Sequence, residues 1–148
     1  MDWFSNMIWL GLGATNLRGG AANYYAVLVT NAGGWSKPLT ETPILTDITA
    51  NLCTASGYAE KQLTTPVWAN DYANQRVTLT FTIPSFGANV AIGQTIAACV
   101  VYYKGTLEST IVDPLMFVIE GTDKATTGGS FTVTVPTPPA YISAIRNS

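Results

Sequence analysis

Residues 76–83, Arg-Val-Thr-Leu-Thr-Phe-Thr-Ile, alternate between apolar side chains and threonine. Successive side chains of a β-strand point to opposite faces of its sheet, so this stretch predicts a strand with one face on a core and a threonine face turned away from it. Residues 95–103 are instead almost entirely apolar. This second pattern predicts a central strand that is covered on both faces.

Further strands are expected where short apolar stretches lie between turn-rich segments, over residues 24–30, 60–68, 107–111, 115–119 and 130–135. Residues 35–58 are mixed and loop-rich, and residues 70–74 are expected to form a turn. Seven or so strands at this spacing favour an all-β fold. We expect a single antiparallel β-sandwich or jelly roll over residues 1–135, with a short N-terminal helix and an extended, proline-rich C-terminal arm over residues 136–148.

Both ends of the chain are apolar. Asp2 can cap a short helix that ends at Gly11 and Gly13, and this helix would form either a lid on the sandwich or a docking element for a neighbour. Pro-Thr-Pro-Pro at 136–139 ends the sheet because proline cannot donate ladder hydrogen bonds. The arm beyond it packs either on its own domain or on a neighbour. The candidate interface residues are Trp3, Phe4, Met7, Ile8, Tyr141, Ile142 and Ile145.

The amino-acid composition excludes most kinds of active site. The 148 residues contain no histidine, 11% charged residues and a net charge of −2. Ser-His-Asp and Cys-His catalysis and histidine-based metal sites are therefore excluded, and we expect no catalytic residue, no metal and no cofactor. The nine carboxylates form no pair at a motif spacing. A calcium site among Asp71, Asp113, Glu120 and Asp123 stays conceivable, although no Asp-x-Asp-x-Asp loop is present.

Charge and hydropathy limit the classes of partner that we expect for this protein. The seven lysines and arginines are scattered, so nucleic acid is not expected as a partner. No apolar run is long enough to cross a bilayer, so a membrane is not expected either. Mean hydropathy is nevertheless positive. This favours an apolar surface that is partly covered by other proteins.

Two small groups of residues leave alternatives open. Cys53 lies in a polar stretch and Cys99 in an apolar run, and their spacing matches no metal motif. Two free thiols are favoured, with a disulfide as the alternative. The aromatic residues Trp35, Trp68 and Tyr72 could form a platform that binds a host glycan, although cores and interfaces use the same residue types.

The order of sequence blocks resembles a family of small structural proteins of tailed bacteriophages. The matching blocks are an apolar N-terminal helix, a tyrosine-rich strand at 24–30, Ser-Gly-Tyr-Ala at 56–59 leading to Gln62-Leu63-Thr64, and strands at 77–83 and 95–103. The resemblance covers roughly residues 1–135. The proline-rich tail and the apolar arm depart from the family pattern.

The resemblance implies a virion protein without an active site, made in the host cytoplasm. Its expected partners are the major capsid protein or other virion proteins, together with copies of itself, a trimer being favoured. The favoured role is capsid decoration, in which the protein cements contacts in the shell. A tail or baseplate appendage is the first alternative, and a host-glycan-binding module is the second.

Overall fold

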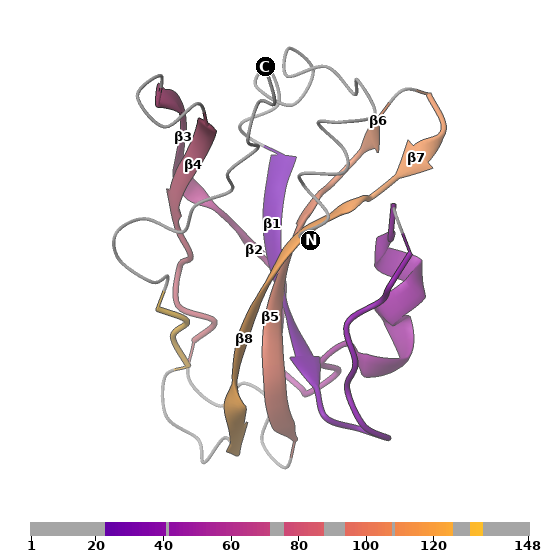
Figure 1. The fold of residues 1–148 in the computed structure, drawn as a ribbon. Helices are drawn as coiled ribbons and strands as arrows, with labels where there is room; N and C mark the ends of the chain where they lie inside the picture. Colours follow the sequence, from indigo (N-terminus) through magenta and orange to yellow (C-terminus); the bar gives the residue numbers. More distant parts are fainter. Residues whose placement is uncertain are drawn as a thin grey trace.

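The computed structural model describes residues 23–40, 42–71, 76–87, 94–107, 109–125 and 131–134. Within these ranges the chain forms short and long strands and one 3₁₀ helix (Figure 1). In chain order they are β1 (Tyr24–Thr30), η2 (Leu45–Asn51), β2 (Lys61–Gln62), β3 (Thr64–Asp71), β4 (Arg76–Thr82), β5 (Thr95–Tyr103), β6 (Thr106–Leu107), β7 (Ile111–Val112) and β8 (Leu115–Ala125). The strand pairs described are antiparallel, which confirms the all-β class.

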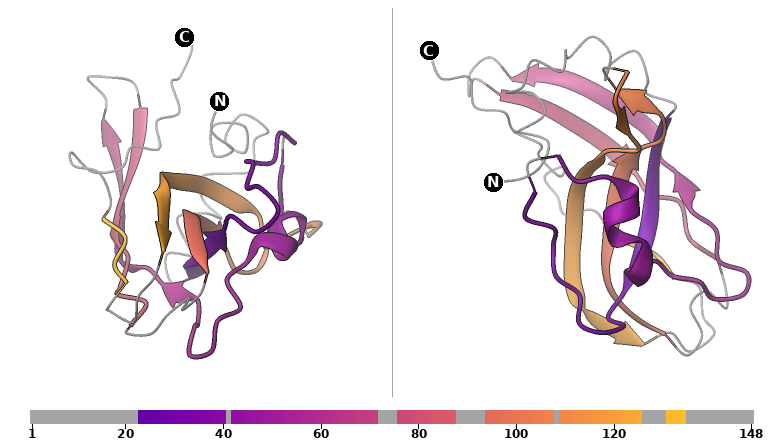
Figure 2. Two further views of the ribbon diagram at one scale, coloured as in Figure 1. Left: turned by 90° about the horizontal axis from the view of Figure 1, so that it is seen from below. Right: turned by 90° about the vertical axis from the view of Figure 1, so that its right-hand side faces the viewer.

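The centre of the fold is a four-stranded sheet with the order β2-β1-β5-β8. Two hairpins accompany it, β3–β4 and β6–β7. Figure 2 shows the β3–β4 hairpin on one side of this sheet and the helical segment on the other. The central sheet is therefore the middle layer of the described molecule, and β1 and β5 are its two inner strands.

Alternating side chains of β1 and β5 enter two different cores. On one face they pack with β4 and the residues after it, and we call this cluster the hairpin-side core. It comprises Tyr24, Ala26, Leu28, Cys53, Leu63, Phe81, Ile83, Phe86, Ile96, Cys99, Val101, Tyr103, Leu107 and Met116. The other face packs against η2, and this helix-side core comprises Val27, Val29, Ile48, Ala98, Val100, Tyr102 and Leu115.

Residues 95–103 confirm the prediction of a central strand covered on both faces. In β5 every residue after Thr95 is buried, which is why this stretch is apolar without alternation. Tyrosines sit directly opposite one another across the β1–β5 pair. Tyr24 and Tyr103 meet edge to face with their ring centroids 5.6 Å apart, on the hairpin side. Such cross-strand aromatic pairs stabilise an antiparallel register.

A β-bulge interrupts β5 at Ala97. The registers with β1 and with β8 both step from Ile96 to Ala98 and skip Ala97. An extra residue reverses the alternation of side chains beyond it and bends the strand. As a result Ile96 and Cys99 lie in the same core although they are three positions apart.

The helix η2 was not predicted from the sequence, where residues 35–58 were expected to be a loop. The helix is a short 3₁₀ turn that begins after Ile44, whose N–H donates to a carboxylate oxygen of Asp47 at 2.9 Å. This contact satisfies a backbone donor that would otherwise lack a partner at the start of the helix. Ile48 is buried in the helix-side core and anchors the segment. A single buried apolar residue gives too little periodicity to reveal such a helix in the sequence.

Other boundaries differ from expectation. The single strand expected over residues 107–111 is wrong, because Leu107 ends β6 and Ile111 begins β7, and Ser109 between them has a φ of 61°. Asn70 and Asp71, expected in a turn, belong to β3, and β8 extends to Ala125. Residues 131–134 contain no assigned strand, yet Phe131 and Val133 are half-buried while the threonines between them are exposed. The expected N-terminal helix and C-terminal arm lie outside the described residues.

The two cysteines lie on either side of β1. The Cys53 N–H donates to the Leu28 carbonyl at 3.0 Å, and Leu28 is in register with Cys99. Since neighbouring strands are about 4.8 Å apart, the two Cα atoms are separated by roughly 10 Å. A disulfide requires a Cα separation below about 7 Å. Both thiols are free and buried, as favoured from the sequence, although Cys53 comes from a polar stretch.

Neither thiol is expected to react while the protein is folded. Burial raises the pKa of Cys53 and raises that of Cys99 to about 12, so the reactive thiolate is scarce at neutral pH. Alkylation in the absence of reductant, followed by intact mass measurement, should show no modification of the native protein and two modifications after denaturation. A denatured protein that takes up no alkyl group would reveal a disulfide and contradict the placement of β1 between the two residues.

Candidate functional site

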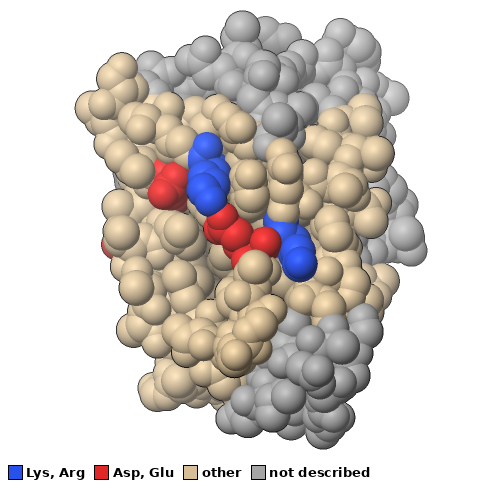
Figure 3. All heavy atoms as spheres, turned by 180° about the vertical axis from the view of Figure 1, so that it is seen from behind, with Lys and Arg blue, Asp and Glu red and all other residues tan. Residues whose placement is uncertain are grey.

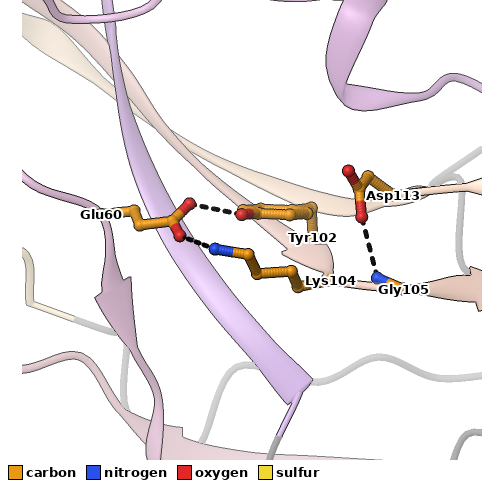
Figure 4. Close-up of polar contacts among 5 residues, drawn as sticks. All are labelled: Glu60, Tyr102, Lys104, Gly105 and Asp113. Carbon is orange, nitrogen blue, oxygen red and sulfur yellow. Dashed lines mark hydrogen bonds and ion pairs between the residues drawn. The ribbon is translucent and has the colours of Figure 1, made fainter.

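A small polar cluster lies at one end of the helix-side face, where side chains from the end of β5 and from the segment before β2 meet across β1. Glu60 accepts hydrogen bonds through its two carboxylate oxygens, from the Tyr102 hydroxyl and from the Lys104 ammonium group (Figure 4). Lys104 also lies over the Tyr25 ring, 4.8 Å from its centroid. Tyr102 is itself buried, whereas Lys104 is about half exposed. We call these four residues the Glu60 cluster.

The electrostatics of the Glu60 cluster oppose acid–base chemistry. Burial, followed by the hydrogen bond to Glu60, raises the pKa of the Tyr102 hydroxyl, which therefore stays protonated. The hydrogen bond to Glu60 raises the pKa of Lys104, so the amine stays charged and is a poor nucleophile. A protonated phenol and an ammonium group that share one carboxylate hold the segment before β2 against β5.

A second set of contacts closes the base of the β6–β7 hairpin. One carboxylate oxygen of Asp113 accepts from the Gly105 N–H at 2.8 Å, and the Asp113 N–H donates to the Gly105 carbonyl at 2.8 Å (Figure 4). Gly105 has a φ of 147°, and a Cβ atom there would lie 3.1 Å from the Tyr103 ring. Position 105 therefore requires glycine on two grounds, its backbone conformation and its space.

Charges are few on the face that Figure 3 shows. Most blue and red side chains gather there in one narrow band, and most of the other described surface in this view is uncharged. Lys104 and Glu60 form a salt bridge. Within the described residues no group of three His, Cys, Asp or Glu side chains could hold a metal ion. The calcium site considered above thus gains no support from Asp113, which is engaged with Gly105, or from Glu120 on β8.

A pocket of about 190 Å³ opens beside the bulge of β5. Its walls come from β5 at residues 96–99, from Ile119 and Glu120 of β8, and from residues 131–134. The pocket lies where the β5–β8 register shifts. We call it the bulge pocket. Its lining is mixed, with the Glu120 side chain and two threonines among otherwise apolar wall residues.

The structure does not bring the proposed glycan platform together. Trp35 is half-buried and packs against the helix-side core, and its backbone N–H donates to Asn31 Oδ1 at 2.9 Å. The backbone of Trp68 lies in β3, in register with Leu79, but its side chain lies outside the description. Tyr72 and the seven candidate interface residues at the chain ends also fall outside the described residues. Glycan binding remains a prediction from sequence.

The Glu60 cluster and the bulge pocket were both missed from sequence. Tyr102 lies in β5 and Lys104 follows directly after its end, and two residues at this spacing in an extended segment share a face, which was a usable signal. Glu60 is more than forty residues away in the sequence, and only the pairing of β1 with both β2 and β5 places it beside them. Nothing in the sequence indicated the bulge, because Ala97 is one of several small apolar residues in residues 95–103.

Removing the Tyr102 hydroxyl should destabilise the protein in a pH-dependent way. The Tyr102→Phe variant loses a hydrogen bond to a carboxylate and should lose about 1–2 kcal/mol of unfolding free energy at pH 7. A pKa raised in the folded state gives a stabilisation that is complete below the unfolded pKa, near 10 for tyrosine, and is lost as the pH rises through the folded pKa. The difference between variant and wild type should therefore shrink above about pH 10.

Urea denaturation of both proteins between pH 7 and pH 11 measures this difference. Tyr25→Phe is the matched control, because it keeps the ring beneath Lys104 and should leave stability almost unchanged. A Tyr102→Phe deficit that is absent at pH 7, or that stays constant to pH 11, would show that the hydroxyl does not bind Glu60 in solution.

No protein-family model, curated protein or solved structure matches this chain. Among the described residues, the one helix is far too short to cross a bilayer. What the protein does is therefore inferred from its own residues, their packing and their charges.

Proposed function

We propose that this protein is a non-enzymatic structural subunit of a tailed-bacteriophage virion, and that it decorates the capsid and cements contacts in the shell. The observation that supports this most is the state of the Glu60 cluster. The Tyr102 hydroxyl and the Lys104 amine both stay protonated, and in these forms they donate to the Glu60 carboxylate. Such an arrangement suits a structural contact and does not suit acid–base catalysis.

The two-sided packing of β1 and β5 supports the same role. A sheet with apolar residues buried on both faces exchanges slowly between conformations and makes a stiff body. We infer that this body is a β-sandwich of the jelly-roll type, in which the central sheet and the layer with β3 and β4 enclose the hairpin-side core. A stiff body is useful to a protein that must hold its neighbours at fixed positions in a shell.

The described surface also suits contact with other proteins. Protein interfaces are depleted of charge at their centres, and this chain has only 11% charged residues. Three apolar side chains stand out from the described surface, namely Leu39 at 96% exposure, Val67 and Val112. The apolar chain ends, with Trp3 and Phe4 at one and Tyr141 and Ile142 at the other, are the segments that we expect to reach neighbouring subunits.

Localisation on the particle tests this function. Cryo-electron microscopy of particles of the phage that encodes the chain, compared with particles lacking the gene, should show difference density on the outer shell. Density confined to the tail would support the appendage alternative and contradict capsid decoration. The absence of any density in the particle would contradict a virion role altogether.

Truncation should separate folding from attachment. Deletion of residues 136–148 removes the apolar arm and should lower the number of copies per particle, as measured by quantitative mass spectrometry of purified virions. Deletion of residues 147–148 alone is the matched control, because it shortens the chain but keeps Tyr141, Ile142 and Ile145. Circular dichroism should show both variants folded. Unchanged occupancy after deletion of 136–148 would mean that the arm does not attach the protein.

A further inference from the structure

Four tyrosines face one another across the β1–β5 pair at one end of the sheet. Tyr24 is in register with Tyr103, and Tyr25 is in register with Tyr102. The rings of Tyr25 and Tyr102 have centroids 6.1 Å apart and planes inclined at 39°. Directly opposed residues on neighbouring antiparallel strands have Cβ atoms only about 5 Å apart. The strand pairing therefore holds the two phenol rings of the Glu60 cluster side by side on the helix-side face.

The Tyr102 hydroxyl has a carboxylate as its hydrogen-bond partner. It donates to one oxygen of Glu60, whose other oxygen accepts from Lys104 (Figure 4). At rest the hydroxyl stays protonated, because burial and the bond to Glu60 raise its pKa. A phenol that loses one electron becomes a strong acid, and a carboxylate already in hydrogen-bond contact can take up the proton in the same step. The contact with Glu60 therefore favours removal of one electron from the Tyr102 ring.

Lys104 determines which of the two rings loses an electron first. Its ammonium group lies over the Tyr25 ring, 4.8 Å from the ring centroid. A positive charge at that position attracts the intact ring and opposes the removal of an electron from it. Tyr102 is therefore oxidised before Tyr25. Once Tyr102 is a radical, Tyr25 is the ring directly opposite it on β1, held in place to combine with it.

We propose that the Tyr25–Tyr102 pair is an oxidative cross-linking site, at which a one-electron oxidant such as a peroxidase intermediate joins β1 to β5 through a dityrosine bond. Each ring gives one electron to the oxidant and loses its hydroxyl proton, that of Tyr102 to Glu60 and that of Tyr25 to solvent. A bond then forms between one Cε atom of each ring, and the hydrogens of these two carbons move to the phenolic oxygens. The inference goes beyond the proposed function and does not depend on it.

The neighbouring Tyr24–Tyr103 pair is a matched control within the same molecule. Its ring centroids are closer, at 5.6 Å, but the two rings meet edge to face with an interplanar angle of 76°. The Tyr103 hydroxyl accepts from Asn23 Nδ2 at 3.3 Å, and this amide group cannot take up a proton. Proximity alone would therefore favour a bond between Tyr24 and Tyr103, whereas a carboxylate that accepts the proton favours the Tyr25–Tyr102 pair.

Photo-oxidation of the full chain with a ruthenium tris-bipyridyl complex and persulfate tests the site. Dilute protein is illuminated briefly, and dityrosine is detected by its fluorescence and located by mass spectrometry of proteolytic peptides. The wild-type protein should form a cross-link between the peptides that contain β1 and β5. Tyr25→Phe should abolish this cross-link, whereas the matched control Tyr103→Phe should keep it. A cross-link that survives Tyr25→Phe, or none in the wild-type protein, would overturn the proposal.

Two further substitutions separate proton acceptance from packing. Glu60→Gln keeps an oxygen that accepts from the Tyr102 hydroxyl but is a far weaker base than a carboxylate, so the yield of the β1–β5 cross-link should fall several-fold. Lys104→Gln removes the ion pair but leaves the carboxylate in place, so it should give at least the wild-type yield. Equal yields for the wild-type protein and Glu60→Gln, or an equal loss in both variants, would show that Glu60 is not the proton acceptor and would overturn the proposal.

Discussion

The pairing of β1 with β5 is the constraint on which the rest of the structure depends. These two strands lie at the centre of the sheet, and their side chains build both cores. A buried strand must satisfy its backbone donors and acceptors on both edges. The second edge of β1 is satisfied by several short segments. The Tyr24 carbonyl accepts from Leu63 N–H at 2.8 Å, and the Leu28 N–H donates to the Tyr58 hydroxyl at 2.8 Å. The path of residues 52–63 follows from these requirements.

The bulge at Ala97 is one of the irregular points of the same sheet, together with a register shift between Val101 and Tyr102. It reverses the alternation in β5 and brings Ile96 to the hairpin side, and the bulge pocket lies beside it. Bulges are common next to functional sites because they change the direction of side chains without unfolding a strand. Here the bulge places a pocket next to residues 131–134, where the chain leaves the described body.

The Glu60 cluster contributes to the stability of the fold. It fixes the segment before β2 to the end of β5 with a carboxylate that is shared by two donors. Lys104 is about half exposed, so its ion pair adds little energy by itself, and the buried Tyr102 hydroxyl contributes more.

Strands with a strong local signal could be predicted from sequence, and features that depend on distant residues could not. The bounds of β1 and β5 match the expected ranges, because their apolar runs end at turn residues such as Asn31 and Gly105. The strand expected at 107–111 was wrong because a two-residue strand leaves no periodic pattern. Contacts such as Glu60 with Tyr102 arise from topology, which local patterns do not encode. The arms and the aromatic residue Tyr72 remain predictions from sequence.

Hydrogen exchange of the full chain, followed by mass spectrometry at low and at high protein concentration, tests the central claim most directly. Backbone amides of β1 and β5 should be the slowest to exchange at both concentrations, since they open only with global unfolding. Rapid exchange in β1 and β5 would contradict a stiff central sheet whose two inner strands build both cores.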